Sequence, residues 1–95
     1  MEINYNKNFL KDLQHHRDKA LAKKLERIFQ QIKAADNISQ IAGLKKLKGF
    51  ENYYRLRTGD YRIGLYIKED YIELQRFLHR KEIYNYYPKT KKRIN

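Results

Sequence analysis

Hydrophobic and polar residues alternate along residues 53–58 and again along residues 61–68, on either side of Gly59-Asp60. Such alternation is typical of β-strands, and a two-residue turn that contains glycine joins two strands into a hairpin. Because the turn fixes the register, the opposite partners follow: on one face Leu56 with Ile63 and Tyr54 with Leu65, and on the other face Arg57 with Arg62 and Arg55 with Gly64. We therefore predict a hairpin with one apolar and one cationic face.

A third alternating run covers residues 71–78 after a second short turn. Antiparallel pairing is expected because the connections are too short for a parallel crossover. The same register would turn Arg76 toward the apolar face and Phe77 away from it, so we predict a β-bulge near Gln75 that restores the phase. The pattern leaves open the face on which His79 lies.

The N-terminal part of the chain changes from alternation to helical spacing. Residues 2–6 alternate and predict a short first strand, whereas apolar residues recur three and four apart from Lys7 to about His16. A longer amphipathic helix follows, with Asp18 as its N-cap and an apolar stripe formed by Leu21, Leu25, Ile28, Phe29 and Ile32. The short connection predicts an antiparallel helical hairpin that covers the sheet. We expect His15 and His16, at the polar end of the first helix, to be solvated.

The linker from residue 38 to residue 47 has an apolar residue at every third position, which predicts a short helical turn followed by extended chain. Three lysines approach the hairpin from this side, namely Lys45, Lys46 and Lys48. Either phosphate contacts or a solvated loop would account for them.

Residues 81–87 predict a short terminal helix that Pro88 stops. Arg80 and Tyr84 are four residues apart, so we expect them on one face. The apolar side of this helix, which we expect to dock on the core, carries Ile83 and Tyr87.

A chain of 95 residues is sufficient for one domain. We expect that domain to span residues 1–88, followed by a disordered basic tail, residues 89–95. The predicted fold class is α+β: an N-terminal helical hairpin packed on a small antiparallel β-sheet of about four strands, with a short C-terminal helix.

The composition excludes several kinds of site. The chain has no cysteine and three histidines, so we expect neither disulfides nor a metal site, and no cofactor-binding motif is present. No apolar stretch approaches the ~20 residues of a membrane span, and the N-terminus does not resemble a signal peptide. We therefore expect a cytoplasmic protein with no membrane partner.

The net charge of +11 is unevenly distributed. Residues 1–40 carry 8 basic and 5 acidic side chains, whereas residues 41–95 carry 14 and 6. Such a field favours a polyanionic partner, most often nucleic acid, or an acidic protein. Arg57 beside Arg62 adds to this interpretation, because like charges on opposite strands repel each other unless solvent or an anion separates them.

Two segments carry a resemblance to a known family: LKGFENYYRLRTGDYRI, residues 47–63, and HRKEIY, residues 79–84. With the predicted order of elements, they resemble the RelE/ParE superfamily of type II toxins, and most of all the RelE-like mRNA interferases. The resemblance implies a RelE-like fold, cleavage of mRNA in the ribosomal A site without a metal, and silencing by an acidic antitoxin. It assigns Arg62 and Arg80 to the scissile phosphate and Tyr84 to the reacting nucleotide.

One departure from the family pattern concerns Arg55 and Arg57, which occupy the places of a Lys-x-Lys pair. A guanidinium does not lose its proton in proteins, so neither arginine can act as a general base. His79 is the titratable candidate for proton transfer, with a structural histidine at a strand end as the alternative. The further predicted RNA contacts are Lys45, Lys46, Lys48, Arg55, Arg57 and Arg76.

Two other functions fit the same sequence. A ParE-like toxin would share the fold but poison DNA gyrase, and a non-catalytic module would bind RNA or the ribosome without cutting. Basic charge and the nine tyrosines suit a binding module equally well. Mapping of RNA ends distinguishes these alternatives from an mRNA endoribonuclease.

Overall fold

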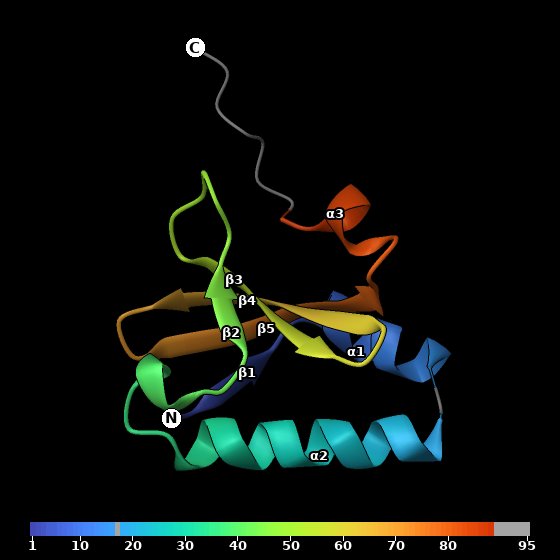
Figure 1. Cartoon of the computed structure of the whole chain (residues 1–95), viewed down its shortest axis with the longest axis horizontal. Helices are drawn as coiled ribbons and strands as arrows, with labels where there is room; N and C mark the ends of the chain where they lie inside the picture. Colours follow the sequence, from blue (N-terminus) through green and yellow to red (C-terminus); the bar gives the residue numbers. More distant parts are fainter. Residues whose placement is uncertain (17, 89–95) are drawn as a thin grey trace.

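A five-stranded sheet forms the middle layer of the fold, in the order β1-β5-β4-β3-β2 (Figure 1). The structure is a computed structural model that describes residues 1–16 and 18–88. Its strands are β1 (Ile3–Tyr5), β2 (Leu44–Lys46), β3 (Tyr53–Thr58), β4 (Tyr61–Lys68) and β5 (Tyr71–His79). The α+β class is confirmed, but the sheet is mixed, because β1 runs parallel to β5 while the other neighbours are antiparallel.

The expected sheet of about four antiparallel strands was therefore wrong in two respects. The helical turn and extended chain expected in the linker are present, as a 3₁₀-helix, η1 (Ile38–Gln40), and the segment of β2, but β2 also pairs with β3 and adds a fifth strand. The first strand lies beside the last, with Ile3 opposite Ile72. The helices between them provide the long connection that a parallel pair requires.

The register of the β3–β4 hairpin is as predicted: Leu56 lies opposite Ile63, and Arg57 lies opposite Arg62. The predicted bulge is also present, because Arg76 pairs with Gly64 whereas Leu74 pairs with Leu65, which leaves Gln75 as the extra residue. The bulge lets β5 turn Leu74 and Phe77 to the same face. We call this apolar side the inner face and the side of Arg57 and Arg62 the outer face.

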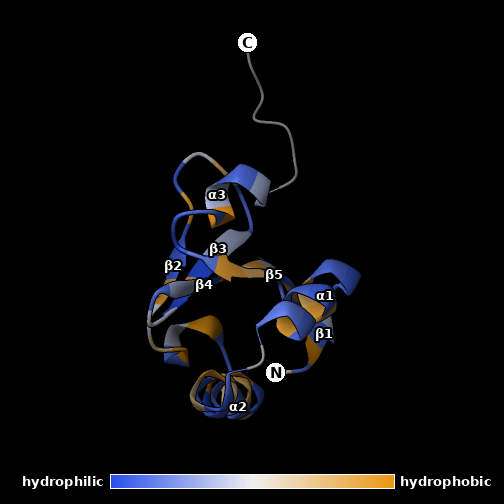
Figure 2. Cartoon of the chain, turned by 90° about the vertical axis from the view of Figure 1, so that its right-hand side faces the viewer, coloured by the Kyte–Doolittle hydropathy of each residue, from blue (hydrophilic) through white to orange (hydrophobic). Residues whose placement is uncertain are grey.

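Two helices cover the inner face, α1 (Lys7–His15) and α2 (Lys19–Ala34). Asn6 caps the first, and the predicted cap Asp18 accepts hydrogen bonds from the amides of Ala20 and Leu21. In Figures 1 and 2, α2 lies beneath the sheet and α1 lies to one side. Within the described ranges, no helix is long and apolar enough to cross a membrane.

A main core fills the space between the inner face and these helices. Its fully buried members come from α1, α2, β4 and β5: Phe9, Ile32, Ile63, Leu65, Ile72, Leu74 and Phe77. The helices meet through Phe9 and Phe29, whose ring centroids lie 6.3 Å apart. Burial of these side chains stabilises the helical hairpin against the sheet, as the apolar stripe predicted.

The C-terminal half of β5 extends beyond the short strand β1, and α1 covers it instead. Here Asp12 accepts a hydrogen bond from the amide of Phe77 at 2.9 Å and two from the Arg76 guanidinium, at 2.8 and 3.0 Å. An exposed strand edge would leave backbone donors without partners. The buried carboxylate supplies the partner that a neighbouring strand would otherwise provide.

The third helix, α3 (Ile83–Tyr86), lies on the outer face (Figure 2). It begins two residues later than the predicted start at Lys81, so Arg80 belongs to the preceding turn and not to the helix. A second small core, formed by Leu78, Ile83 and Tyr87, holds it there. The predicted tail, residues 89–95, lies outside the described residues.

Candidate nucleic-acid interface

Arginines from two strands and one turn meet on the outer face. Strand alternation turns Arg55, Arg57 and Arg62 to this side. The amide of Arg80 donates a hydrogen bond to the carbonyl oxygen of Asp60 at 2.7 Å, which keeps the chain beside the β3–β4 turn after β5 ends. We call Arg55, Arg57, Arg62 and Arg80 the arginine cluster.

Arg62 lies at the centre of this cluster. Its guanidinium donates hydrogen bonds to the carbonyl oxygens of Gly59 and Tyr61, both at 2.9 Å. Partial burial, followed by repulsion from Arg57 and Arg55, lowers the pKa of Arg62 from its usual value. It nevertheless stays charged at neutral pH. Arg55, Arg57 and Arg62 therefore form an electrostatically unfavourable arrangement in the free protein that a phosphate would relieve, whereas Arg80 lies 3.6 Å from a carboxylate oxygen of Asp60.

Tyr84 is 55% exposed and lies within electrostatic range of Arg62. Tyr84 raises the pKa of Arg62, whereas the neighbouring arginines lower it. Its helix is docked by the flanking residue Ile83, which is fully buried. The structure thus brings four predicted site residues from different elements together with Tyr84: Arg55, Arg57, Arg62 and Arg80. Forked guanidinium donors match phosphate oxygens, and an exposed phenol ring can stack on a base or transfer a proton.

His79 is not part of this group. It lies opposite Tyr61 on the inner face, with the ring centroids 5.5 Å apart, and its Nδ1 accepts a hydrogen bond from the amide of Lys81 at 3.1 Å. The bulge in β5 decides this orientation, which the sequence left open. The histidine therefore contacts the turn before α3 and lies across the sheet from Arg62.

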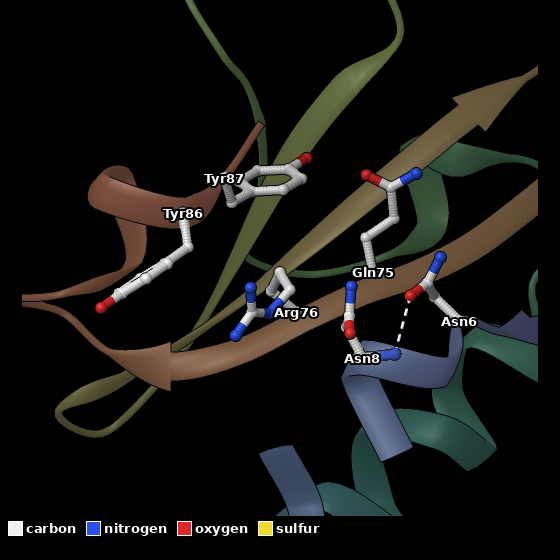
Figure 3. Close-up of a pocket in the computed structure, with 6 residues that line it drawn as sticks. All are labelled: Asn6, Asn8, Gln75, Arg76, Tyr86 and Tyr87. Carbon is white, nitrogen blue, oxygen red and sulfur yellow. Dashed lines mark hydrogen bonds between the residues drawn. The ribbon is translucent and has the colours of Figure 1, made fainter. Parts of the chain in front are cut away.

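Arg76, predicted as an RNA contact, is engaged inside the protein. Its guanidinium binds both carboxylate oxygens of Asp12, and its side chain is 17% exposed. The same guanidinium lies 5.3 Å from the centre of the Tyr86 ring. Both residues line a small cavity between α1, β5 and α3 (Figure 3). Arg76 therefore connects these elements, with its guanidinium bonded to Asp12, and its contact with RNA stays a prediction.

The three lysines near β2 are all exposed. Lys45 lies opposite Arg55 and extends the outer face to the edge strand. Lys46 pairs with Tyr54 and so points toward the inner side, and Lys48 lies in the loop before β3. Of the three, Lys45 is the lysine that the register aligns with the cluster.

Tyr87 is a functional candidate that the sequence reasoning missed, because it was expected only to dock apolar surface. Its hydroxyl lies 2.6 Å from the carbonyl oxygen of Tyr54 and 2.5 Å from that of Leu65, and accepts a hydrogen bond from the Tyr54 amide at 3.1 Å. Its ring covers Gly64, where an added Cβ would lie 2.7 Å from three ring carbons. The Tyr87 ring therefore fills the space beside Arg55 on the outer face. A glycine inside a strand was the available signal for such a close approach.

His16 was expected to be solvated, and that expectation was wrong. Its ring lies 4.9 Å from the Tyr61 ring and 5.7 Å from the Phe77 ring, whereas His15 is exposed. Within residues 1–16 and 18–88, no group of three or more histidine, aspartate or glutamate side chains could hold a metal ion.

Comparison with known proteins supplies the family. Residues 3–84 match the model described as ParE toxin of type II toxin-antitoxin system, parDE. The chain is 38% identical to Toxin RelE3 of Methanocaldococcus jannaschii over 89 residues, which is 93% of this chain and 100% of that protein.

Solved structures give the same result. The toxin in the RelB-RelE antitoxin-toxin complex from Methanococcus jannaschii is 38% identical, with a TM-score of 0.76 over 90% of this chain and 99% of that one. The archaeal RelE-RelB complex from Pyrococcus horikoshii OT3, at 22% identity, has a TM-score of 0.66 over 83% of this chain and 93% of that one, which supports the fold. The chain therefore belongs to the RelE/ParE superfamily, within the family of ParE toxins of type II toxin-antitoxin systems.

Proposed function

We propose that the protein is a toxin that cleaves mRNA in the ribosomal A site and so inhibits translation. The observation that carries this proposal is the arginine cluster with Tyr84 near Arg62. On this face Arg57 and Arg62 lie opposite each other and repel each other in the absence of an anion. The RelE relative at 38% identity supports the same activity class. Ribosomes and their messages are cytoplasmic, so the proposed activity is cytoplasmic too.

The proposed reaction needs no metal. The 2′-hydroxyl of the message gives its proton to solvent water as its oxygen attacks the adjacent phosphorus, the bond from phosphorus to the 5′-oxygen breaks, and that oxygen takes up a proton. Products are a 2′,3′-cyclic phosphate and a 5′-hydroxyl end. Arg62 and Arg80 neutralise the negative charge that develops on the phosphate oxygens. Arg55, Arg57 and Lys45 hold neighbouring phosphates.

Tyr84 would stack on the base beside the scissile bond and supply the proton for the leaving 5′-oxygen. The arginines cannot do this, because a guanidinium is too weak an acid to give up its proton. His79, across the sheet, would act only by holding the turn that leads to Arg80, through its hydrogen bond from Lys81.

The proposed partner is a cognate antitoxin whose acidic, partly disordered segment covers the arginine cluster. Two relatives were solved as complexes with a RelB antitoxin. Charge complementarity would steer such a segment to the outer face, and the segment would order on binding. A purified toxin-antitoxin complex that leaves the cluster fully exposed would contradict this part of the proposal.

Defined cell-free translation, with mRNA 5′ ends mapped, tests the activity. We expect cuts that require ribosome-bound message and that are lost in Arg62→Ala and Arg80→Ala. Arg27→Ala removes an exposed cation of α2 and serves as the matched control. Tyr84→Phe keeps the ring, so cutting by this variant at wild-type rate would exclude proton transfer by the phenol.

Absence of cuts with folded wild-type protein would contradict the proposal. Inhibition of DNA gyrase in the same preparation would then identify a ParE-like poison. Salt-sensitive ribosome binding without cleaved ends would instead identify a non-catalytic module.

A further inference from the structure

The hydroxyl of Tyr87 occupies an unusual position at the backbone of two strands. It shares its single proton between the carbonyl oxygens of Tyr54 in β3 and Leu65 in β4, and it accepts from the Tyr54 amide. The residue is 2% exposed, and burial raises the pKa of its phenol. An apolar ring would fill the same space, so the hydroxyl has a role beyond packing.

The three elements that meet at Tyr87 carry all of the proposed site except Arg80 and Lys45. Arg55 and Arg57 extend from β3, Arg62 extends from β4, and Tyr84 belongs to α3. The Tyr87 amide also donates a hydrogen bond to the carbonyl oxygen of Ile83 at 2.8 Å, which closes the single turn of α3. One side chain therefore joins the helix of Tyr84 to both arginine strands.

Gly64 makes this contact possible. It lies between Arg55 on β3 and Arg76 on β5, and the Tyr87 ring rests directly on it. A methyl group there would lie 2.7 Å from the ring carbons, closer than carbon atoms approach each other. The ring would have to move, and its hydroxyl would leave the two strands.

We propose that Tyr87 is a positioning residue. Its ring packs on Gly64, and this contact fixes Tyr84 relative to Arg55, Arg57 and Arg62. This inference rests on the proposed nuclease function and adds to it a residue that does not touch the substrate. A displacement of about 1 Å at a reacting group can lower a rate about 10²-fold. Binding of RNA, by contrast, depends mainly on the arginines, which a substitution of Tyr87 leaves in place.

Tyr87→Phe is the direct test, because it removes one oxygen and keeps the ring. With mRNA bound to programmed ribosomes, we expect kcat to fall about 10- to 100-fold while KM changes less than about twofold. Tyr86→Phe is the matched control, since the half-exposed Tyr86 ring lies against the guanidinium of Arg76 on β5, whereas the Tyr87 hydroxyl bonds to the backbone of β3 and β4. It should keep the wild-type kcat.

Amide hydrogen exchange gives a readout that does not depend on activity. The Tyr54 amide donates to the Tyr87 hydroxyl, whereas the Phe77 amide donates to Asp12. In Tyr87→Phe we expect exchange at Tyr54 and in α3 to accelerate at least about tenfold, and exchange at Phe77 to stay unchanged. A merely global loss of stability would accelerate all of them.

Gly64→Ala tests the contact between the Tyr87 ring and Gly64. It should lower kcat at least as much as Tyr87→Phe, and the effect should shrink when Tyr87 is also replaced by alanine, because the clashing ring is gone. If Gly64→Ala does not fold, the Tyr87→Phe measurements still decide. Wild-type kcat in Tyr87→Phe, or unchanged exchange at Tyr54, would overturn the positioning role of Tyr87 and leave the proposed function standing. Wild-type protein that does not cleave would overturn the proposed function, and this assignment with it.

Discussion

Replacing Arg62 by alanine should separate activity from stability. In the free protein the guanidinium gains two hydrogen bonds, to Gly59 and Tyr61, each worth about 0.5–1.5 kcal/mol net at a partly exposed site. Removal of the like-charge pair with Arg57 returns about 0.2–1 kcal/mol, and relief from Arg55 and Arg80 adds to this gain. These terms oppose each other, so we expect the free energy of unfolding to fall by about 1–2 kcal/mol.

The loss of activity should be much larger. One donor to the developing negative charge is worth about 10²–10³ in kcat, which corresponds to about 2.7–4 kcal/mol. The assay pairs cleavage of ribosome-bound mRNA with a thermal melt followed by circular dichroism. Each change of about 1 kcal/mol corresponds to a Tm shift of about 4–8 °C for a domain of this size. A fall in Tm much larger than the expected loss of stability gives, or cleavage within about threefold of wild type, would refute the reasoning.

Two further predictions concern stability. Asp12→Ala should lower the free energy of unfolding by about 3–5 kcal/mol, because it leaves Arg76 and the Phe77 amide without their buried partner. Urea denaturation measures this loss, and the exposed Asp36→Ala is the control; equal effects of the two variants would contradict the role of Asp12. Stability should also fall as the pH rises above about 10, because the unfolded chain then releases the phenol proton of Tyr87 while burial keeps it bound in the folded state. The folded pKa is raised, so this contribution is complete below the unfolded pKa and is lost above it. Tyr87→Phe should weaken the alkaline decline, and identical slopes for both proteins would contradict the assignment.

Local patterns were sufficient for the parts of the fold that neighbouring residues determine. A two-residue turn fixes the register of a hairpin, so the pairs Leu56–Ile63 and Arg57–Arg62 followed from alternation alone. The bulge followed from a conflict that the sequence itself contains, because Phe77 had to face the core. Asp18 was recognised as an N-cap because its short side chain reaches the first free amides of α2.

Long-range contacts could not be obtained in this way. The three residues of β1 alternate equally well in either direction, so nothing local selects a parallel partner in β5. No role was predicted for Asp12, although its spacing of three residues from Phe9 places a carboxylate on the apolar side of the helix. In the candidate site, the cluster of Arg55, Arg57 and Arg62 was predictable from the register. The engagement of Arg76 by Asp12 and the seat of Tyr87 on Gly64 depend on elements far apart in sequence.

The pairing of the first strand with the last has a consequence during biosynthesis. Ile3 meets Ile72, sixty-nine residues further along the chain, and synthesis at about 5–20 residues per second separates the two by several seconds. Arg80, Tyr84 and Tyr87 emerge later still. A nascent chain therefore has no complete site for most of its translation, and products that terminate before Arg80 lack both Arg80 and Tyr84. Under the proposed function, the ribosome that synthesises the toxin faces no active enzyme until the final strand has closed the sheet.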